Sequence, residues 1–67
     1  MKEHLHHKVE RILRRYGFTD IRVRPDSDRQ VVLSGTVADF DERAMAIAIA
    51  RTTPGVQEID NEITIAK

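Results

Sequence analysis

The feature that most constrains the fold is a strand that leads directly into a helix in the middle of the chain. Residues 30–37 are rich in β-branched side chains, which favour a strand. Just beyond it, Asp39 precedes Glu42 by three positions, the spacing of a helix capping box. We therefore predict a helix that continues through the alanine-rich residues 44–51 and ends before Pro54, because the residue before a proline is disfavoured in a helix.

The spacing of apolar residues predicts the other elements. Between residues 3 and 16 one helical stripe is formed by Leu5, Val9, Ile12, Leu13 and Tyr16. Gly17 then provides a C-terminal cap. Residues 21–24 alternate apolar and basic and lead into turn residues 25–28, so a half-buried strand enters a hairpin. Alternation within residues 56–65 predicts a last strand.

The predicted order is helix, strand, strand, helix, strand. A short hairpin joins the first two strands antiparallel, so the sheet is not all parallel. We predict an α+β fold, a three-stranded mixed sheet with two helices packed on one face. Residues 1–67 form a single domain, because a chain of 67 residues accommodates one hydrophobic core. The chain has no cysteine, so neither a disulfide nor a thiolate zinc site supports that core.

Composition and charge exclude several classes. With 40% hydrophobic and 33% charged residues, the chain is too apolar for disorder and too charged for a membrane span. The net charge is zero, with basic residues concentrated in residues 1–24 and acidic ones in residues 25–67. The charged N-terminal segment lacks the apolar region of a signal peptide. The few aromatic residues and the absence of a Gly-x-x-Gly loop argue against nucleic acid as a partner.

No residue set predicts catalysis. Ser34 and Thr36 lie in a strand without an assignable histidine, so we expect no enzymatic activity. His4 and His7 are three residues apart on the first helix and could share a divalent metal with Glu3 or His6. Solvated histidines explain the pattern better, and we predict neither a metal site nor a cofactor.

Basic residues recur along the first helix at Lys8, Arg11 and Arg15. A solvent-exposed helix face is sufficient to explain these basic residues. The more specific alternative is that they contact anionic lipid headgroups. Arg22 and Arg24 are expected on the other face of the sheet, where acids of a neighbouring strand can neutralise them.

An ordered set of motifs covers nearly the whole chain. It comprises Leu5 to Leu13, Gly17-Phe18, Ile21-x-Val23, Val31-x-Leu33-Ser34-Gly35-Thr36-Val37, Glu42-Arg43, Ala46, Ile49-Ala50, Pro54-Gly55-Val56 and a final Ile-x-Ile. In this order and spacing the chain resembles the BON domain, named for bacterial osmotically induced and nodulation proteins. The resemblance implies a domain without enzymatic activity, usually part of a larger protein, found mostly in the bacterial cell envelope or periplasm and associated with phospholipid or membrane surfaces.

Two glycines are predicted to be structural. Gly35 stands in a strand that a helix must cover, which is expected where no side chain fits, with a backbone contact to a ligand as the lesser alternative. Gly55 follows Pro54 and permits a positive φ after the helix ends.

The second helix carries two apolar stripes on nearly opposite sides. One is formed by Ala46, Ile49, Ala50 and Thr53, and the other by Phe40, Ala44, Ile47 and Ala48. The family pattern places the first stripe inward. The candidate lipid- or partner-binding surface then comprises Phe40, Arg43, Ala44, Ile47 and Arg51. Packing of the first helix on this stripe, or the reverse choice of buried stripe, is the alternative.

The predicted function is therefore that of a non-enzymatic binding module. Its leading partner is an anionic phospholipid surface, reached through the second helix. The alternative is a protein-docking or oligomerisation module, in which the same surface meets another protein domain or a second copy of the chain.

Overall fold

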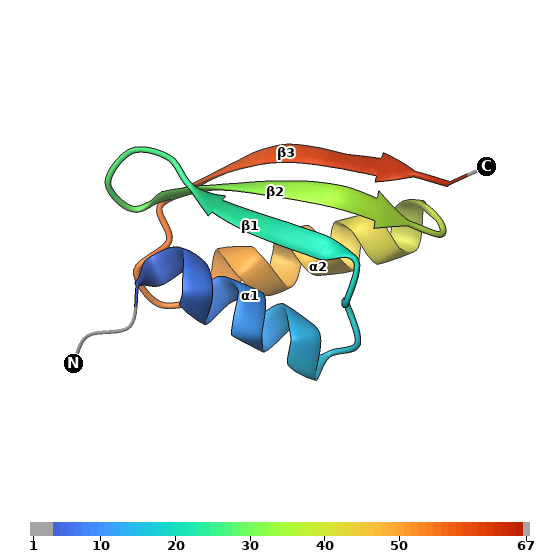
Figure 1. Ribbon diagram of the computed structural model, residues 1–67, viewed down its shortest axis with the longest axis horizontal. Helices are drawn as coiled ribbons and strands as arrows, with labels where there is room; N and C mark the ends of the chain where they lie inside the picture. The colour runs from blue at the N-terminus through green and yellow to red at the C-terminus, as the bar shows by residue number, and fades with distance from the viewer. Residues whose placement is uncertain (1–3, 67) are drawn as a thin grey trace.

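The computed structural model describes residues 4–66 and has the predicted order of elements (Figure 1). Its elements are α1 (Leu5–Arg15), β1 (Ile21–Pro25), β2 (Gln30–Val37), α2 (Phe40–Thr52) and β3 (Glu58–Ile65). The predicted start of the first helix at Glu3 lies outside the described residues. Tyr16, predicted as helical, is the C-cap of α1.

The three strands form one mixed sheet in the order β1-β2-β3. β1 and β2 form an antiparallel hairpin that pairs Val23 with Leu33. β2 and β3 are parallel, with Val31 opposite Ile59, because α2 carries the chain back across the sheet between them. Both helices lie on the same side of the sheet, and its other face is open (Figure 1). The predicted α+β class and architecture are confirmed.

The core lies between the sheet and the two helices. Its buried residues are Val9, Leu13, Ile21, Val23, Val31, Leu33, Val37, Ala46, Ala50 and Ile63. They follow helical spacing in α1 and α2 and alternate along the strands, as expected for elements with one buried face. Val32 faces the opposite way from Leu33 and is also buried, although the core cluster does not include it. Its neighbours on the two adjacent strands are Arg24 and Asp60, whose charged side chains flank Val32 on the open face.

α1 ends in a Schellman motif. The Gly17 amide donates to the Arg14 carbonyl, and the Phe18 amide donates to the Leu13 carbonyl. Gly17 has φ +94°, the left-handed conformation that this cap requires. The predicted glycine cap is confirmed.

The hairpin turn differs from the prediction by one position. Pro25 belongs to β1, and the loop is closed by the Asp26 amide donating to the Gln30 carbonyl. Arg29, in which no positive φ was predicted, adopts φ +62°.

Gly35 holds the sheet against the α1–β1 connection. Its φ is +124°, and a Cβ atom there would lie 2.1 Å from the Asp20 carbonyl oxygen. Both the conformation and the close backbone approach leave no room for a side chain at Gly35.

Candidate functional site

α2, the helix that carries the predicted binding residues, is fixed at both ends. The Asp39 side chain accepts a hydrogen bond of 2.8 Å from the Glu42 amide, and the Glu42 side chain accepts one of 3.0 Å from the Ala38 amide. These bonds satisfy one amide in the first turn and one just before the helix. The second bond reaches Ala38 instead of the N-cap Asp39, so the arrangement is a variant of the predicted capping box. At the other end the Thr53 hydroxyl donates to the Ile49 carbonyl, and Gly55 has φ +101°. The predicted positive φ at Gly55 is confirmed.

The buried stripe of α2 is the one predicted. Ala46, Ala50 and Thr53 are buried, and Ile49 is half-buried. Alanine at the buried positions lets the helix approach the sheet closely. The opposite face of α2 is consequently exposed.

The structure separates the candidate residues of α2 by exposure. Phe40 is 68% exposed, and Ala44 and Arg51 are also exposed. Arg43 is half-buried, with its guanidinium carbon 4.9 Å from the centre of the Phe40 ring. This is within cation–π range, so the two side chains form one unit on the surface.

Ile47 differs from its prediction as a solvent-facing residue. It is half-buried and packs against the core cluster. Its place on the helical wheel explains this, because it lies 60° from the buried Ala50 at 100° per residue. It therefore forms the border between the exposed face and the core.

Two exposed apolar side chains were not among the predicted site residues. Met45 is 55% exposed and Tyr16 is 67% exposed. Met45 lies between the two stripes recognised in the sequence, so no periodic signal marked it. Tyr16 was assigned to the apolar stripe of the first helix, but the chain leaves the helix at that residue.

The outer face of α1 is strongly basic. Arg11, Arg14 and Arg15 are exposed, and Lys8 is half-buried with Nζ 3.5 Å from the Pro54 carbonyl oxygen. Only one acid, Glu10, lies within the helix, and its carboxylate is 3.7 Å from the Arg14 guanidinium. α1 therefore presents a net positive surface beside α2.

Three histidines gather at the beginning of α1. The ring centres of His6 and His7 are 4.2 Å apart, and His4 lies 5.7 Å from His6. The pKa of His6 is lowered, mainly because its imidazole is partly buried and to a lesser extent because the His7 and His4 imidazoles are close by. The Glu10 carboxylate raises this pKa and so acts in the opposite direction. Among residues 4–66, no group of three histidine or acidic side chains is placed to hold a metal ion. Glu3, named as a possible ligand, lies outside the described residues.

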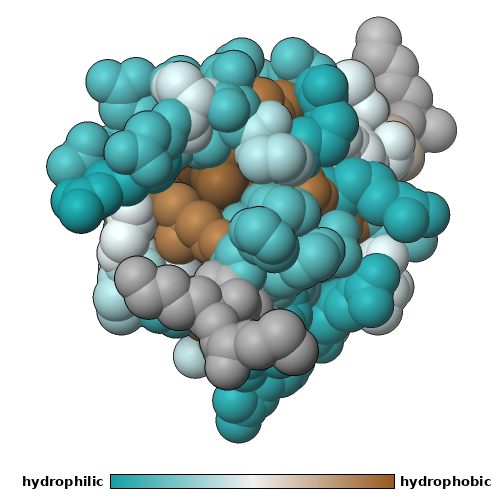
Figure 2. Space-filling model, turned by 60° about the vertical axis from the view of Figure 1, so that its left-hand side comes forward, coloured by the Kyte–Doolittle hydropathy of each residue, from teal (hydrophilic) through white to brown (hydrophobic). Residues whose placement is uncertain are grey.

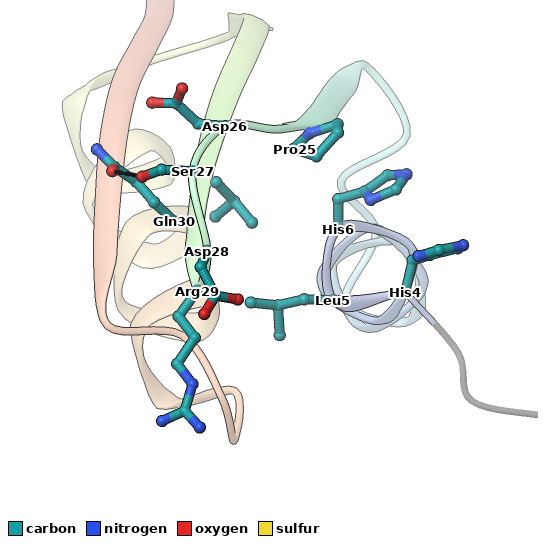
Figure 3. A pocket seen from close by; sticks show the side chains of 10 residues that line it. His4, Leu5, His6, Pro25, Asp26, Ser27, Asp28, Arg29 and Gln30 are labelled. Carbon is teal, nitrogen blue, oxygen red and sulfur yellow. Dashed lines mark hydrogen bonds between the residues drawn. The ribbon is translucent and has the colours of Figure 1, made fainter.

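A hollow of about 380 Å³ lies between the start of α1 and the hairpin. Figure 3 shows Leu5 pointing into it, with His4 and His6 on the helix side and Asp26 to Asp28 on the hairpin side. The Ser27 hydroxyl bonds to the Gln30 side chain at its rim. Figure 2, in which this side of the molecule comes forward, shows a hydrophobic area surrounded by hydrophilic residues. The hollow is wide open to solvent, so it lacks the enclosed character of a small-molecule pocket.

Comparison with known proteins decides the family. Residues 2–67 match the BON domain, which is essentially the whole chain. The chain belongs to the BON domain family. No curated protein matches this BON domain in sequence.

A solved structure shares the fold of this BON domain. It belongs to CdsD, a structural protein of the type III secretion system of Chlamydia trachomatis, and superposes with a TM-score of 0.78 over 92% of the BON domain. The two are 17% identical, and the match spans 30% of the CdsD chain. The neighbour shows the shared fold, and membership of the BON family fits a non-enzymatic binding or docking module.

The open face of the BON domain is occupied by cross-strand polar pairs. Arg24 forms a 2.9 Å ion pair with Glu62, which confirms the predicted neutralisation for this arginine. The Thr36 and Thr64 hydroxyls are 3.2 Å apart, so Thr36 bonds to a threonine rather than to a base. Neither helix in the described part of the domain is long and apolar enough to cross a membrane.

Proposed function

We propose that this BON domain is a non-enzymatic module that binds an anionic phospholipid surface through its two-helix layer. In this proposal the exposed face of α2 contacts the apolar part of the interface, and the basic face of α1 contacts the headgroups. The domain would thereby attach a parent protein to a membrane surface.

One observation carries the proposal: a basic helix and an exposed apolar helix face lie side by side on the same side of the sheet (Figure 1). The open face carries Glu58, Asp60 and Glu62 on β3, so the acidic strand faces away from this layer. Arg22 and Arg24 on β1 offset most of this acidic charge, so an anionic surface attracts the helix layer more strongly than the open face. This arrangement supports an oriented attachment by the helices.

The expected energies are modest and additive. Each basic residue near an anionic surface contributes about 1 kcal/mol, so loss of two arginines lowers the affinity about 30-fold. A fully buried phenylalanine contributes about 1.5–3 kcal/mol relative to an exposed one, and Phe40 is 68% exposed before binding. Phe40 thus contributes on the order of 1–2 kcal/mol.

Flotation with vesicles of phosphatidylglycerol and phosphatidylcholine tests the proposal. The wild-type domain is expected to float with anionic vesicles and not with pure phosphatidylcholine. Phe40→Asp, and separately Arg11→Gln with Arg15→Gln, should reduce flotation. Matched controls are Gln57→Asp, an exposed neutral-to-acidic change, and Arg22→Gln with Arg24→Gln, which removes the same charge from the open face.

Absence of flotation by the wild-type domain contradicts the lipid proposal. Concentration-dependent sedimentation of the same proteins then tests the alternative. Association of the wild-type domain that Phe40→Asp abolishes would assign the exposed α2 face to protein contact between copies.

A further inference from the structure

The two edges of the sheet differ in how their backbone groups are protected. On β1 the outward-pointing amide of Val23 donates to Glu10 Oε2 of α1 at 3.3 Å. Pro25, two residues later, has no amide hydrogen. An inserted side chain and a proline are common ways to block a sheet edge, so β1 is closed to another strand.

β3 forms the other edge and is longer, with eight residues against five in β1. The amides of Glu58 and Ala66, at its two ends, donate toward β2, to the Arg29 and Val37 carbonyls. Alternate residues of a strand point their backbone groups to opposite sides. Odd-numbered residues of β3 therefore direct their amides and carbonyls outward, away from β2.

One outward amide of β3 is already bonded. The Ile63 amide donates to the side-chain oxygen of Asn61 at 3.0 Å. The amides of Ile59, Asn61 and Ile65 have the same outward direction, and β3 is the end of the strand order within residues 4–66. This edge therefore offers backbone donors and acceptors to a further strand.

The side chains of β3 select what can pair there. On the open face Glu58 and Asp60 are exposed, and on the helix side Ile59 and Ile65 are half-buried. Like charges directly opposite one another destabilise a strand pair, so antiparallel pairing with β3 of a second copy is disfavoured. Basic residues on one face and apolar residues on the other complement this edge.

The sheet itself contains an example of this complementarity. β1 alternates apolar and basic residues, and its Arg24 reaches across β2 to Glu62. Within residues 4–66, no strand pairs with the other side of the same acidic strand. An added strand of the same alternation would place basic residues beside Glu58 and Asp60 and cover Ile59 and Ile65.

We propose that the outer edge of β3 binds an extended segment of another protein in which basic residues alternate with apolar ones. The segment extends the sheet by one strand through backbone hydrogen bonds. This edge is separate from the two-helix layer, so strand binding at β3 does not depend on lipid binding by the helices.

Amide hydrogen exchange, followed by NMR on the intact domain, tests the proposal. The probe is a short blocked peptide of alternating valine and arginine. At near-saturation the exchange of the Ile59 and Asn61 amides is expected to slow about tenfold, while the Ile21 amide at the β1 edge is unchanged. A peptide of the same sequence in which every backbone amide is N-methylated lacks the donors in either strand orientation and should give no protection.

Charge variants provide the second part of the test. Glu58→Gln with Asp60→Asn should weaken peptide binding about 2- to 30-fold, because two opposite-charge pairs are lost. Asp20→Asn with Asp41→Asn removes the same charge away from this edge and should leave the affinity unchanged.

Equal binding of the N-methylated peptide, or absence of protection at Ile59 and Asn61, would overturn the proposal. Protection of these amides that grows with domain concentration alone would also overturn it, because a second copy would then occupy the edge.

Discussion

Gly35→Ala offers the most exacting test of how the sheet is built. In the folded domain Gly35 has φ +124°, and an added Cβ would meet the Asp20 carbonyl oxygen at 2.1 Å. The carbonyl carbon of Asp20 and the Cα of Ile21 would follow at 3.1 Å. All three are backbone atoms, so no side-chain rotation can relieve the contact.

The magnitude follows from two contributions. A backbone conformation that only glycine adopts freely costs about 1–3 kcal/mol for alanine. Relief of the contact also requires β1 to move away from β2 at the Ile21 and Gly35 pair, which breaks neighbouring ladder hydrogen bonds of about 1 kcal/mol each. The total, about 3–5 kcal/mol, equals the whole stability expected of so small a domain.

Gly17→Ala is the matched control. Gly17 also has a positive φ, +94°, but a Cβ there meets nothing within 4 Å. Strain alone then costs about 1–2 kcal/mol. Urea unfolding followed by far-ultraviolet circular dichroism should find Gly17→Ala folded and Gly35→Ala largely unfolded. Equal unfolding free energies for the two variants would refute the close-approach explanation.

Three further perturbations have smaller expected effects. Asp39→Ala removes the hydrogen bond that caps the Glu42 amide and should lower the unfolding free energy by about 1 kcal/mol. In a urea titration the midpoint should fall by about 1 M, and an unchanged midpoint would show that the cap contributes nothing. Arg24→Gln should change stability by less than about 0.5 kcal/mol, because the ion pair with Glu62 is more than half exposed, and a larger loss in the same urea titration would contradict this. The pKa of His6 is lowered from 6.5 in the folded domain, so its protonation favours the unfolded chain. The unfolding free energy should be at its full value above pH 6.5 and decrease as the pH falls through 6.5 toward the folded pKa. In His6→Gln this decrease should be smaller, which urea titrations at several pH values across that interval can measure.

The fold was predictable because each element carries a local signal that agrees with the others. The β-branched residues at 30–37 mark the central strand, and Asp39 marks the start of α2 within one residue. Gly17 and Gly55 stand where the backbone needs a positive φ. At these positions the local conformational preference of each residue agrees with the overall topology. Such agreement is what allows a fold to be predicted from a single sequence.

The candidate surface was predictable only in outline. Helical spacing distinguishes the exposed Phe40 from the buried Ala46, but the depth of Ile47 depends on how α2 sits against the sheet. The exposure of Met45 has the same origin. Helical periodicity gives the direction of a side chain, and packing of the elements determines how far it is covered.

Protection of the sheet edges could not be predicted either. The bond from the Val23 amide to Glu10 joins residues 13 positions apart, and it exists only because α1 packs beside β1. Arg29 takes a left-handed conformation that its residue type does not favour, because the hairpin closes between Asp26 and Gln30. Such features follow from the assembled structure.

Which face of the domain meets a membrane can be measured most directly with site-specific labels. The chain has no cysteine, so single cysteines at Ala48, on the exposed face of α2, and at Arg22, on the open face of the sheet, can each carry an environment-sensitive fluorophore. On addition of phosphatidylglycerol vesicles, we expect a blue shift for the label at Ala48 and none for the label at Arg22. A shift confined to Arg22, or no shift at either position, would contradict attachment through the two-helix layer.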